Sequence, residues 1–175
     1  MKAVFIAPRK YIQGRGVMRE LGAYLKLLGK KPLLLWDACV RDIVGPTVLE
    51  SVRQAGLEAV PVDFAGEATA AERARVTGIA RQNGADISVG IGGGKVLDVA
   101  KAAAVDAGIK MVTVPTIASN DSPTSAASVW YDADHNFIGF DCWPFNPDIV
   151  VVKSASFPKG EVPAHLRGYL IKSGE

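Results

Sequence analysis

The sequence predicts a doubly wound α/β fold with a mostly parallel sheet, into which a β-hairpin is inserted. Short runs rich in Val, Ile and Leu alternate with longer amphipathic stretches. Near-continuous apolar strands of this kind are typical of a sheet that helices cover on both faces. Glycines follow the amphipathic stretches, at the place where helices commonly end. This alternation of strand and helix favours an α/β sheet over an all-α or all-β fold.

Apolar runs predict four strands, and the amphipathic stretches predict four helices. The strands are 32–37, 58–63, 87–91 and 111–114, and the helices are 16–28, 38–55, 69–83 and 95–107. In the first helix, apolar residues recur on one helical face at Val17, Leu21, Leu25 and Leu28. The glycines that follow the helices are Gly29, Gly56, Gly84 and Gly108.

The pattern changes after residue 114. Residues 115–123 form a polar, turn-rich loop, and 125–131 and 136–141 are expected to form an antiparallel hairpin around a turn that contains His135. A last strand is expected at 148–152. We therefore expect one domain over residues 1–152, followed by a divergent tail at 153–175 that has no helical stripe of useful length.

Composition excludes several classes of function. The 175 residues carry a net charge of +2 with no block of like charges, which argues against nucleic-acid partners and a polybasic membrane patch. The longest apolar runs are too short to span a bilayer. Cys39 and Cys142 have no partner at metal-binding or disulfide spacing, so we expect packed thiols and a cytoplasmic location. His135 and His165 are expected to be solvated.

A run of three glycines, Gly92, Gly93 and Gly94, joins a predicted strand directly to a predicted helix that opens on Lys95. Glycines let a ligand approach the backbone closely, and a helix N-terminus attracts phosphate. A cation in the first helical turn opposes the helix dipole unless an anion lies nearby, which favours a bound pyrophosphate. The alternative is that the glycines only make a tight turn. The spacing matches neither a Walker A loop nor GxGxxG.

Two further groups of polar residues follow strand ends. Asp37 ends the strand at 32–37, where a carboxylate can accept from ribose hydroxyls, or can cap the next helix instead. The stretch 116–122 follows the predicted strand at 111–114. It contains three hydroxyl groups, an amide and a carboxylate. It suits a polyol or a ribose-nicotinamide, or forms a turn with a helix cap.

Together these residues resemble one family. The stretches are GIGGGKVLDVAKA, TVPTIASNDSPTSAASVWY and NPDIVVV, with Asp37 closing LLLWD. They are similar to the NAD-binding half of the glycerol dehydrogenases, which belong to the iron-containing, metal-dependent polyol dehydrogenase family. The nucleotide domain of that family is Rossmann-like and also resembles that of dehydroquinate synthase.

The resemblance implies oxidation of glycerol, or of a similar small diol, to dihydroxyacetone with NAD. It implies that Asp37 contacts the adenosine end and that Gly93, Gly94 and Lys95 hold the pyrophosphate. The rest of the dinucleotide would be lined by Thr116, Ser119, Ser125, Ala127 and Tyr131. Asp121 matches the carboxylate that faces the polyol.

Family members continue into a helical domain that binds Zn²⁺ or Fe²⁺. Here Lys153 follows the last strand where relatives have Asp, Ile171 falls about where the metal-binding Asp would be, and no position matches a metal ligand. The resemblance therefore implies a C-terminally truncated chain that binds NAD and is weakly active or inactive alone. The alternative is a non-catalytic nucleotide-binding or oligomerising module, and an exposed apolar face would favour a homo-oligomer. A lyase similar to dehydroquinate synthase, or a different alcohol dehydrogenase, is disfavoured by VPTIASNDSP.

Overall fold

The structure is a computed structural model that describes residues 6–117 and 121–153. Ser119 and the predicted tail after residue 153, with His165, lie outside the described residues. The elements in chain order are β1 (Lys10–Gly14), the 3-10 helix η1 (Val17–Arg19), α1 (Leu21–Leu25), β2 (Pro32–Trp36), α2 (Ala38–Gln54), β3 (Val60–Asp63), α3 (Ala70–Gln82), β4 (Ile87–Gly92), α4 (Gly94–Ala107), β5 (Lys110–Pro115), β6 (Ala127–Tyr131), β7 (Phe137–Cys142) and β8 (Ile149–Lys153).

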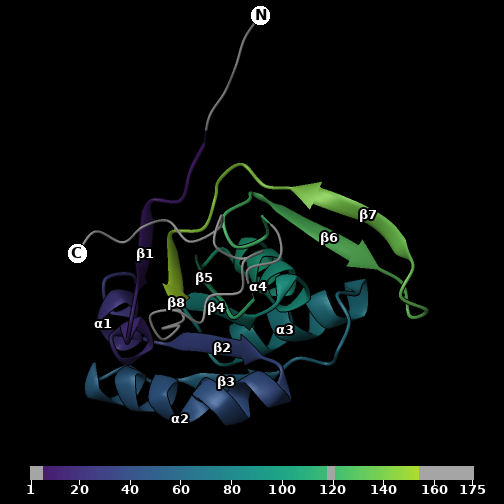
Figure 1. Cartoon of the computed structure of the whole chain (residues 1–175). Helices are drawn as coiled ribbons and strands as arrows, with labels where there is room; N and C mark the ends of the chain where they lie inside the picture. Colours follow the sequence, from purple (N-terminus) through teal and green to yellow (C-terminus); the bar gives the residue numbers. More distant parts are fainter. Residues whose placement is uncertain (1–5, 118–120, 154–175) are drawn as a thin grey trace, which may run out of the picture.

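Six strands form one sheet in the order β1-β8-β5-β4-β2-β3, and every neighbouring pair is parallel. Helices α1 and α2 cover one face of this sheet, and α3 and α4 cover the other (Figure 1). The predicted doubly wound α/β fold is therefore confirmed. The predicted hairpin is also present: β6 and β7 pair antiparallel and lie over α3 and α4 (Figure 1).

The alternating side chains of β2 fill two separate hydrophobic clusters. Leu34 and Trp36 pack with residues of α1 and α2, whereas Leu33 and Leu35 pack with residues of α3 and α4. All four side chains are fully buried. Burial on both faces explains why this strand has an uninterrupted apolar sequence.

The N-terminal part differs from the prediction. Strand β1 was not expected, because it lies at the sheet edge and its exposed and half-buried residues form no apolar run. The helix predicted at 16–28 is divided into η1 and α1, although Val17, Leu21 and Leu25 are buried on the predicted face.

Two smaller predictions are corrected. Gly56, Gly84 and Gly108 have the left-handed backbone of a helix-ending glycine, but Gly29 does not. Gly29 instead leaves room for the Asp86 carboxylate, which accepts hydrogen bonds from the Lys30 and Lys31 amides at 2.7 Å each. The prediction of packed thiols is wrong, since Cys39 and Cys142 are both exposed.

The hairpin is fastened to the helical layer by Arg73 of α3. Its guanidinium lies 5.3 Å from the centre of the Trp130 ring and 5.4 Å from that of Trp143. It also forms salt bridges at 2.7 Å with Asp106 at the end of α4 and with Asp141 of β7. One side chain thus joins two helices and both hairpin strands.

The order of strands creates a place for a ligand. Strand β2 leads through α2 to β3 on one side, while its neighbour β4 leads through α4 to β5 on the other. Open α/β sheets bind ligands outside the carboxyl ends of two strands whose connections diverge in this way. The carboxyl ends of β2 and β4 are that position here.

Gly90 sets the distance between β4 and α4. A Cβ atom at this position would lie 2.8 Å from the Ala100 Cβ and 3.1 Å from the Leu97 Cα. We expect Gly90→Ala to lower the free energy of unfolding by about 1–3 kcal/mol, because neither contact can move without shifting α4. Gly78→Ala in α3 is the matched control. Its Cβ meets nothing within 4 Å, so it should raise stability by about 0.5–1 kcal/mol. Urea denaturation of both variants measures these changes in the free energy of unfolding. Equal changes in the two variants would contradict the role assigned to Gly90.

Candidate functional site

A cavity of about 270 Å³ opens at the N-terminus of α4, beneath the hairpin. Helix α4, the segment that precedes β6, and β6 itself supply its walls. The lining residues are Gly94, Lys95, Asp98, Asp121, Ser122, Ser125, Ala127, Val129 and Tyr131. Six of the ten residues singled out from the sequence are among them: Gly94, Lys95, Asp121, Ser125, Ala127 and Tyr131.

Three more of those ten follow neighbouring strands at the same edge of the sheet. Asp37 follows β2, Gly93 follows β4, and Thr116 follows β5, and these strands are adjacent in the order β5-β4-β2. The Thr116 amide donates to the Gly92 carbonyl at 3.0 Å, which holds the loop after β5 against the glycine turn. The tenth residue, Ser119, is outside the described part of the chain.

The N-terminus of α4 carries no side-chain cap. Gly93 occupies the N-cap position with extended backbone, and the first turn has no acidic residue. The first amides of a helix have no partner within the helix and carry a partial positive charge. This end of α4 therefore suits an anionic ligand group.

Lys95 has an anionic partner within the chain. Its Nζ lies 2.5 Å from Oε2 of Glu67 and 4.8 Å from the centre of the Tyr131 ring. The argument that Lys95 needs a bound anion to offset the helix dipole is thus weakened, because Glu67 already supplies one. Sequence reasoning missed Glu67, which lies 28 residues before Lys95 in the loop after β3.

Glu67 is also contacted from the hairpin. His135, in the β6–β7 turn, is exposed as predicted, but its Nδ1 contacts the same Oε2 of Glu67. The other carboxylate oxygen accepts from the Ala68 amide at 2.8 Å. Burial alone would raise the pKa of Glu67, but the hydrogen bonds from these two side chains and the amide outweigh it and lower the pKa to about 2.

Asp37 makes no capping hydrogen bond, although it occupies the N-cap position of α2. Half-burial of the carboxyl group raises the pKa of Asp37 above its ordinary value. The helix-cap alternative therefore lacks its hydrogen bond, and the carboxylate remains available to a ligand at the end of β2.

A second charged group beneath the cavity was missed altogether. Lys101 is fully buried, and its Nζ lies 2.9 Å from Oδ1 of Asp98, one turn earlier in α4. Both residues stand in the stretch GGGKVLDVAKA. Two opposite charges at i, i+3 on an otherwise apolar helix face were the available clue, since buried charges are paired.

Comparison with known proteins decides the family. A profile of the iron-containing alcohol dehydrogenases matches residues 8–154. The chain belongs to the iron-containing alcohol dehydrogenase family. The resemblance predicted from the glycine turn and the residues after β5 is thereby confirmed.

Several members of the family are similar over most of this chain. It is 40% identical to a glycolaldehyde reductase of Halobacterium salinarum over 174 residues, which are 99% of this chain and 46% of that protein. It is 42% identical to a glycerol dehydrogenase of Pseudomonas putida over 149 residues, 85% of this chain and 41% of that protein. The chain thus spans less than half the length of these relatives.

Solved structures of the family have the same fold. A probable glycerol dehydrogenase from Sinorhizobium meliloti superposes with a TM-score of 0.80 at 40% identity, over 86% of this chain and 41% of that one. A glycerol dehydrogenase from Schizosaccharomyces pombe also gives 0.80, at 30% identity, over 87% of this chain and 39% of that one.

Within residues 6–117 and 121–153, no three His, Cys, Asp or Glu side chains come together as a metal-binding group. Among the same residues, none of the helices could cross a membrane.

The Glu67 cluster predicts a pH dependence. The carboxylate is stabilised in the folded chain, so its contribution is complete above pH 4.5 and is lost as the pH falls toward 2. The difference in unfolding free energy between the wild type and Glu67→Gln should therefore shrink over this range. Chemical denaturation from pH 6 to pH 2 measures it.

Glu58→Gln is the control for this experiment. Glu58 is 74% exposed and pairs with Lys31 at the surface, where such pairs contribute little. A Glu67→Gln difference that stays constant across the range, or that Glu58→Gln reproduces, would contradict the assignment.

Proposed function

We propose that this chain is the NAD-binding domain, over residues 1–152, of a dehydrogenase that acts on glycerol or a similar small diol. The main support is the cavity at the N-terminus of α4. It gathers six residues that the family resemblance assigned to the dinucleotide and the polyol, taken from two separate parts of the chain, the start of α4 and residues 121–131. Similarity to glycerol dehydrogenases at 40–42% identity supports the substrate class.

In this proposal the dinucleotide lies across the carboxyl ends of β2, β4 and β5. Asp37, whose side chain does not cap α2, accepts from hydroxyl groups at the adenosine end. The uncapped first turn of α4, with Gly93 and Gly94, donates backbone amides to the pyrophosphate. Lys95 adds a positive charge beside it. Thr116, which follows β5, contacts the dinucleotide there, and the family resemblance alone assigns Ser119, outside the described residues, to the same ligand.

The segment that leads into β6 holds the other end of the dinucleotide. Ser125, Ala127 and Tyr131 line the cavity opposite α4. NAD, when bound, supplies the acceptor for a hydride from the alcohol carbon. The chain itself orients the dinucleotide and excludes water along the cavity wall. Asp121, at the cavity rim and exposed, faces the polyol and accepts hydrogen bonds from its hydroxyl groups.

The residues described here do not fit a catalytic metal, because no three potential ligands come together among them. No step of the proposed role is therefore routed through Zn²⁺ or Fe²⁺. We expect the chain alone to bind NAD and to turn over glycerol weakly or not at all. We also propose that the protein is located in the cytoplasm.

The substrate class extends to small hydroxy carbonyl compounds. The Halobacterium relative, similar over 99% of this chain, is named a glycolaldehyde reductase. Glycolaldehyde and dihydroxyacetone both carry a hydroxyl group next to the carbonyl. Either compound therefore suits a site that forms hydrogen bonds to two neighbouring oxygen atoms of its substrate.

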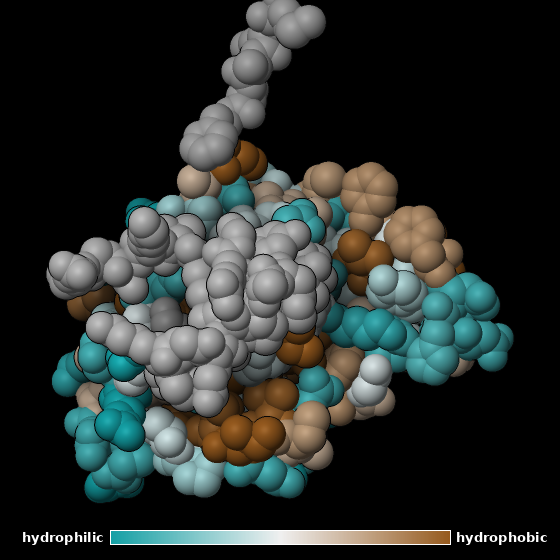
Figure 2. Space-filling view, in the orientation of Figure 1, coloured by the Kyte–Doolittle hydropathy of each residue, from teal (hydrophilic) through white to brown (hydrophobic). Residues whose placement is uncertain are grey.

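A second candidate is a non-catalytic module that binds a nucleotide or self-associates. The outer strand β7 favours it, since Phe137, Ile138 and Phe140 are each about 60% exposed. Figure 2 shows these hydrophobic residues gathered where the hairpin forms the surface. Light scattering of the purified chain tests self-association, and a monomer at all concentrations would count against it.

Calorimetric titration with NAD⁺ tests the main proposal. We expect saturable binding, weakened about tenfold or more in Lys95→Ala, because a hydrogen bond to a charged group contributes about 1.5–3 kcal/mol. Gly94→Val should abolish it by placing a side chain at the helix end where the pyrophosphate would lie.

Lys26→Ala is the control, since Lys26 is exposed at the end of α1 and away from the cavity. It should bind NAD⁺ as the wild type does. Absence of binding at millimolar NAD⁺ in the wild type, or equal loss in all three variants, would overturn the proposal.

A further inference from the structure

The buried pair Asp98–Lys101 is a charged feature that the proposed chemistry does not use. Lys101 has no exposed surface and Asp98 is 6% exposed. A fully buried ammonium group is retained only where enough acceptors surround it, because removing it from water is costly. The partners of Lys101 therefore indicate what the group does.

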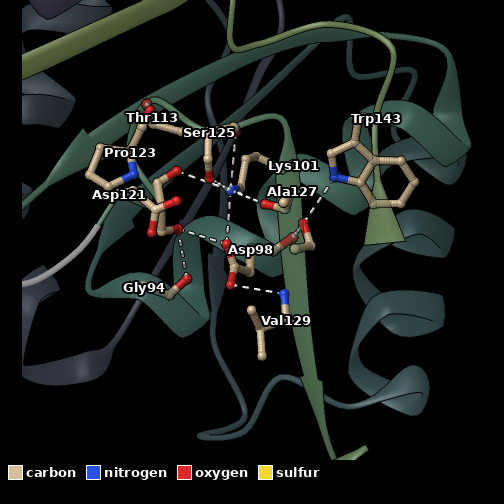
Figure 3. A network of polar contacts seen from close by, with 12 residues as sticks. Gly94, Asp98, Lys101, Thr113, Asp121, Pro123, Ser125, Ala127, Val129 and Trp143 are labelled. Atoms are coloured by element: carbon tan, nitrogen blue, oxygen red, sulfur yellow. Dashed lines mark hydrogen bonds and ion pairs between the residues drawn. The ribbon is translucent and has the colours of Figure 1, made fainter. Parts of the chain in front are cut away.

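Three of these partners are backbone carbonyls of the segment that leads into and begins β6. The Lys101 ammonium donates to the carbonyls of Ser122 at 3.0 Å, Ser125 at 3.4 Å and Ala127. The Ser125 hydroxyl lies at 3.4 Å. Figure 3 shows the ammonium nitrogen at the centre of this group. The segment thus curves around a single positive charge.

Asp98 fastens the same segment at two more points. Its Oδ1 accepts from the Ser122 hydroxyl at 2.6 Å, and its Oδ2 accepts from the Val129 amide at 3.1 Å. Its own backbone carbonyl accepts from the Ser128 hydroxyl at 2.8 Å. The dashed lines of Figure 3 follow these contacts from α4 into β6.

These contacts determine the shape of one wall of the cavity. The residues they hold or adjoin, Ser122, Ser125, Ala127 and Val129, all line it. Asp98 reaches the cavity itself, whereas Lys101 does not. If the Lys101 ammonium were removed, the three carbonyls and the Asp98 carboxylate would lose a hydrogen-bond donor while still buried. The cavity wall would then have to move for these oxygen atoms to reach water.

We propose that Lys101 is a positioning residue for the nucleotide, which acts through Asp98 and the carbonyls at 122, 125 and 127 to hold the wall in its binding shape. This inference rests on the proposed function, because it names a determinant of affinity for the same cavity. Lys101 touches no ligand in this arrangement. Its effect is transmitted by the position of Ser125 and Ala127.

The pKa of Lys101 agrees with this arrangement. Burial lowers it below the ordinary lysine value, while the neighbouring Asp98 acts in the opposite direction. The carboxylate therefore helps to keep the ammonium charged, and the charged form is the one that can donate to three carbonyls at once.

The test is NAD⁺ affinity of Lys101→Met, measured by calorimetry beside thermal unfolding. Methionine keeps the length of the side chain but supplies no donor. We expect the Kd to rise at least tenfold. We also expect faster amide hydrogen exchange at residues 125–129 than in the wild type, with no change in β4 and β5.

Ser88→Ala is the matched control for stability. Ser88 is fully buried in β4 and donates to the Ala100 carbonyl of α4 at 2.8 Å, so its loss weakens the same helix without touching the wall. It should lower the Tm and leave the Kd unchanged. Equal changes of Kd in the two variants would reduce Lys101 to a general contribution to stability and overturn the proposal.

If Lys101→Met does not fold, the NAD⁺ affinity of Asp98→Asn tests the proposal instead. Asparagine is isosteric but uncharged, so it leaves the ammonium without its counter-charge. A raised Kd in a folded Asp98→Asn chain supports the proposal, and an unchanged Kd overturns it. Failure of the wild type itself to bind NAD⁺ would overturn the proposed function, a distinct result.

Discussion

The close approach of α4 to β4 is the constraint on which the site depends. Gly90 allows the helix to lie so near the strand that a side chain at that position would collide with Ala100 and Leu97. This contact fixes the direction of α4, whose first turn lies at the cavity. Lys95, Asp98 and Lys101 then follow from the helix geometry, one behind another along the face that meets the hairpin.

Two cations, Arg73 and Lys101, help to hold the hairpin to the helices. Arg73 lies between two tryptophan rings and binds Asp106 and Asp141 on the outer side. On the inner side, Lys101 gathers backbone carbonyls. Lys101 is fully buried and Arg73 is partly buried, so both cations stabilise one arrangement of the hairpin over others more strongly than fully exposed pairs would. The contacts of Arg73 and Lys101 together determine the geometry of the cavity wall.

How far the sequence predicts this structure depends on how local each feature is. Strands β2, β4 and β5 are recognisable because burial on both faces leaves mostly apolar residues in them. Strand β1 is not, because it is an edge strand whose partner comes 139 residues later. For the candidate site, residues next to a strand end or a glycine turn could be located. Glu67 and the Lys101 contacts could not, since they depend on how distant segments meet.

Strand β8 lies between β1 and β5, which has a consequence for the order in which the chain can fold. During synthesis from the N-terminus, residues 10–14 leave the ribosome early but have no partner until residues 149–153 follow. The four strands β5, β4, β2 and β3 can pair with one another before that point. Strand β1 therefore cannot join the sheet until β8 has been made, and pairing over so long a sequence separation makes its docking a slow step.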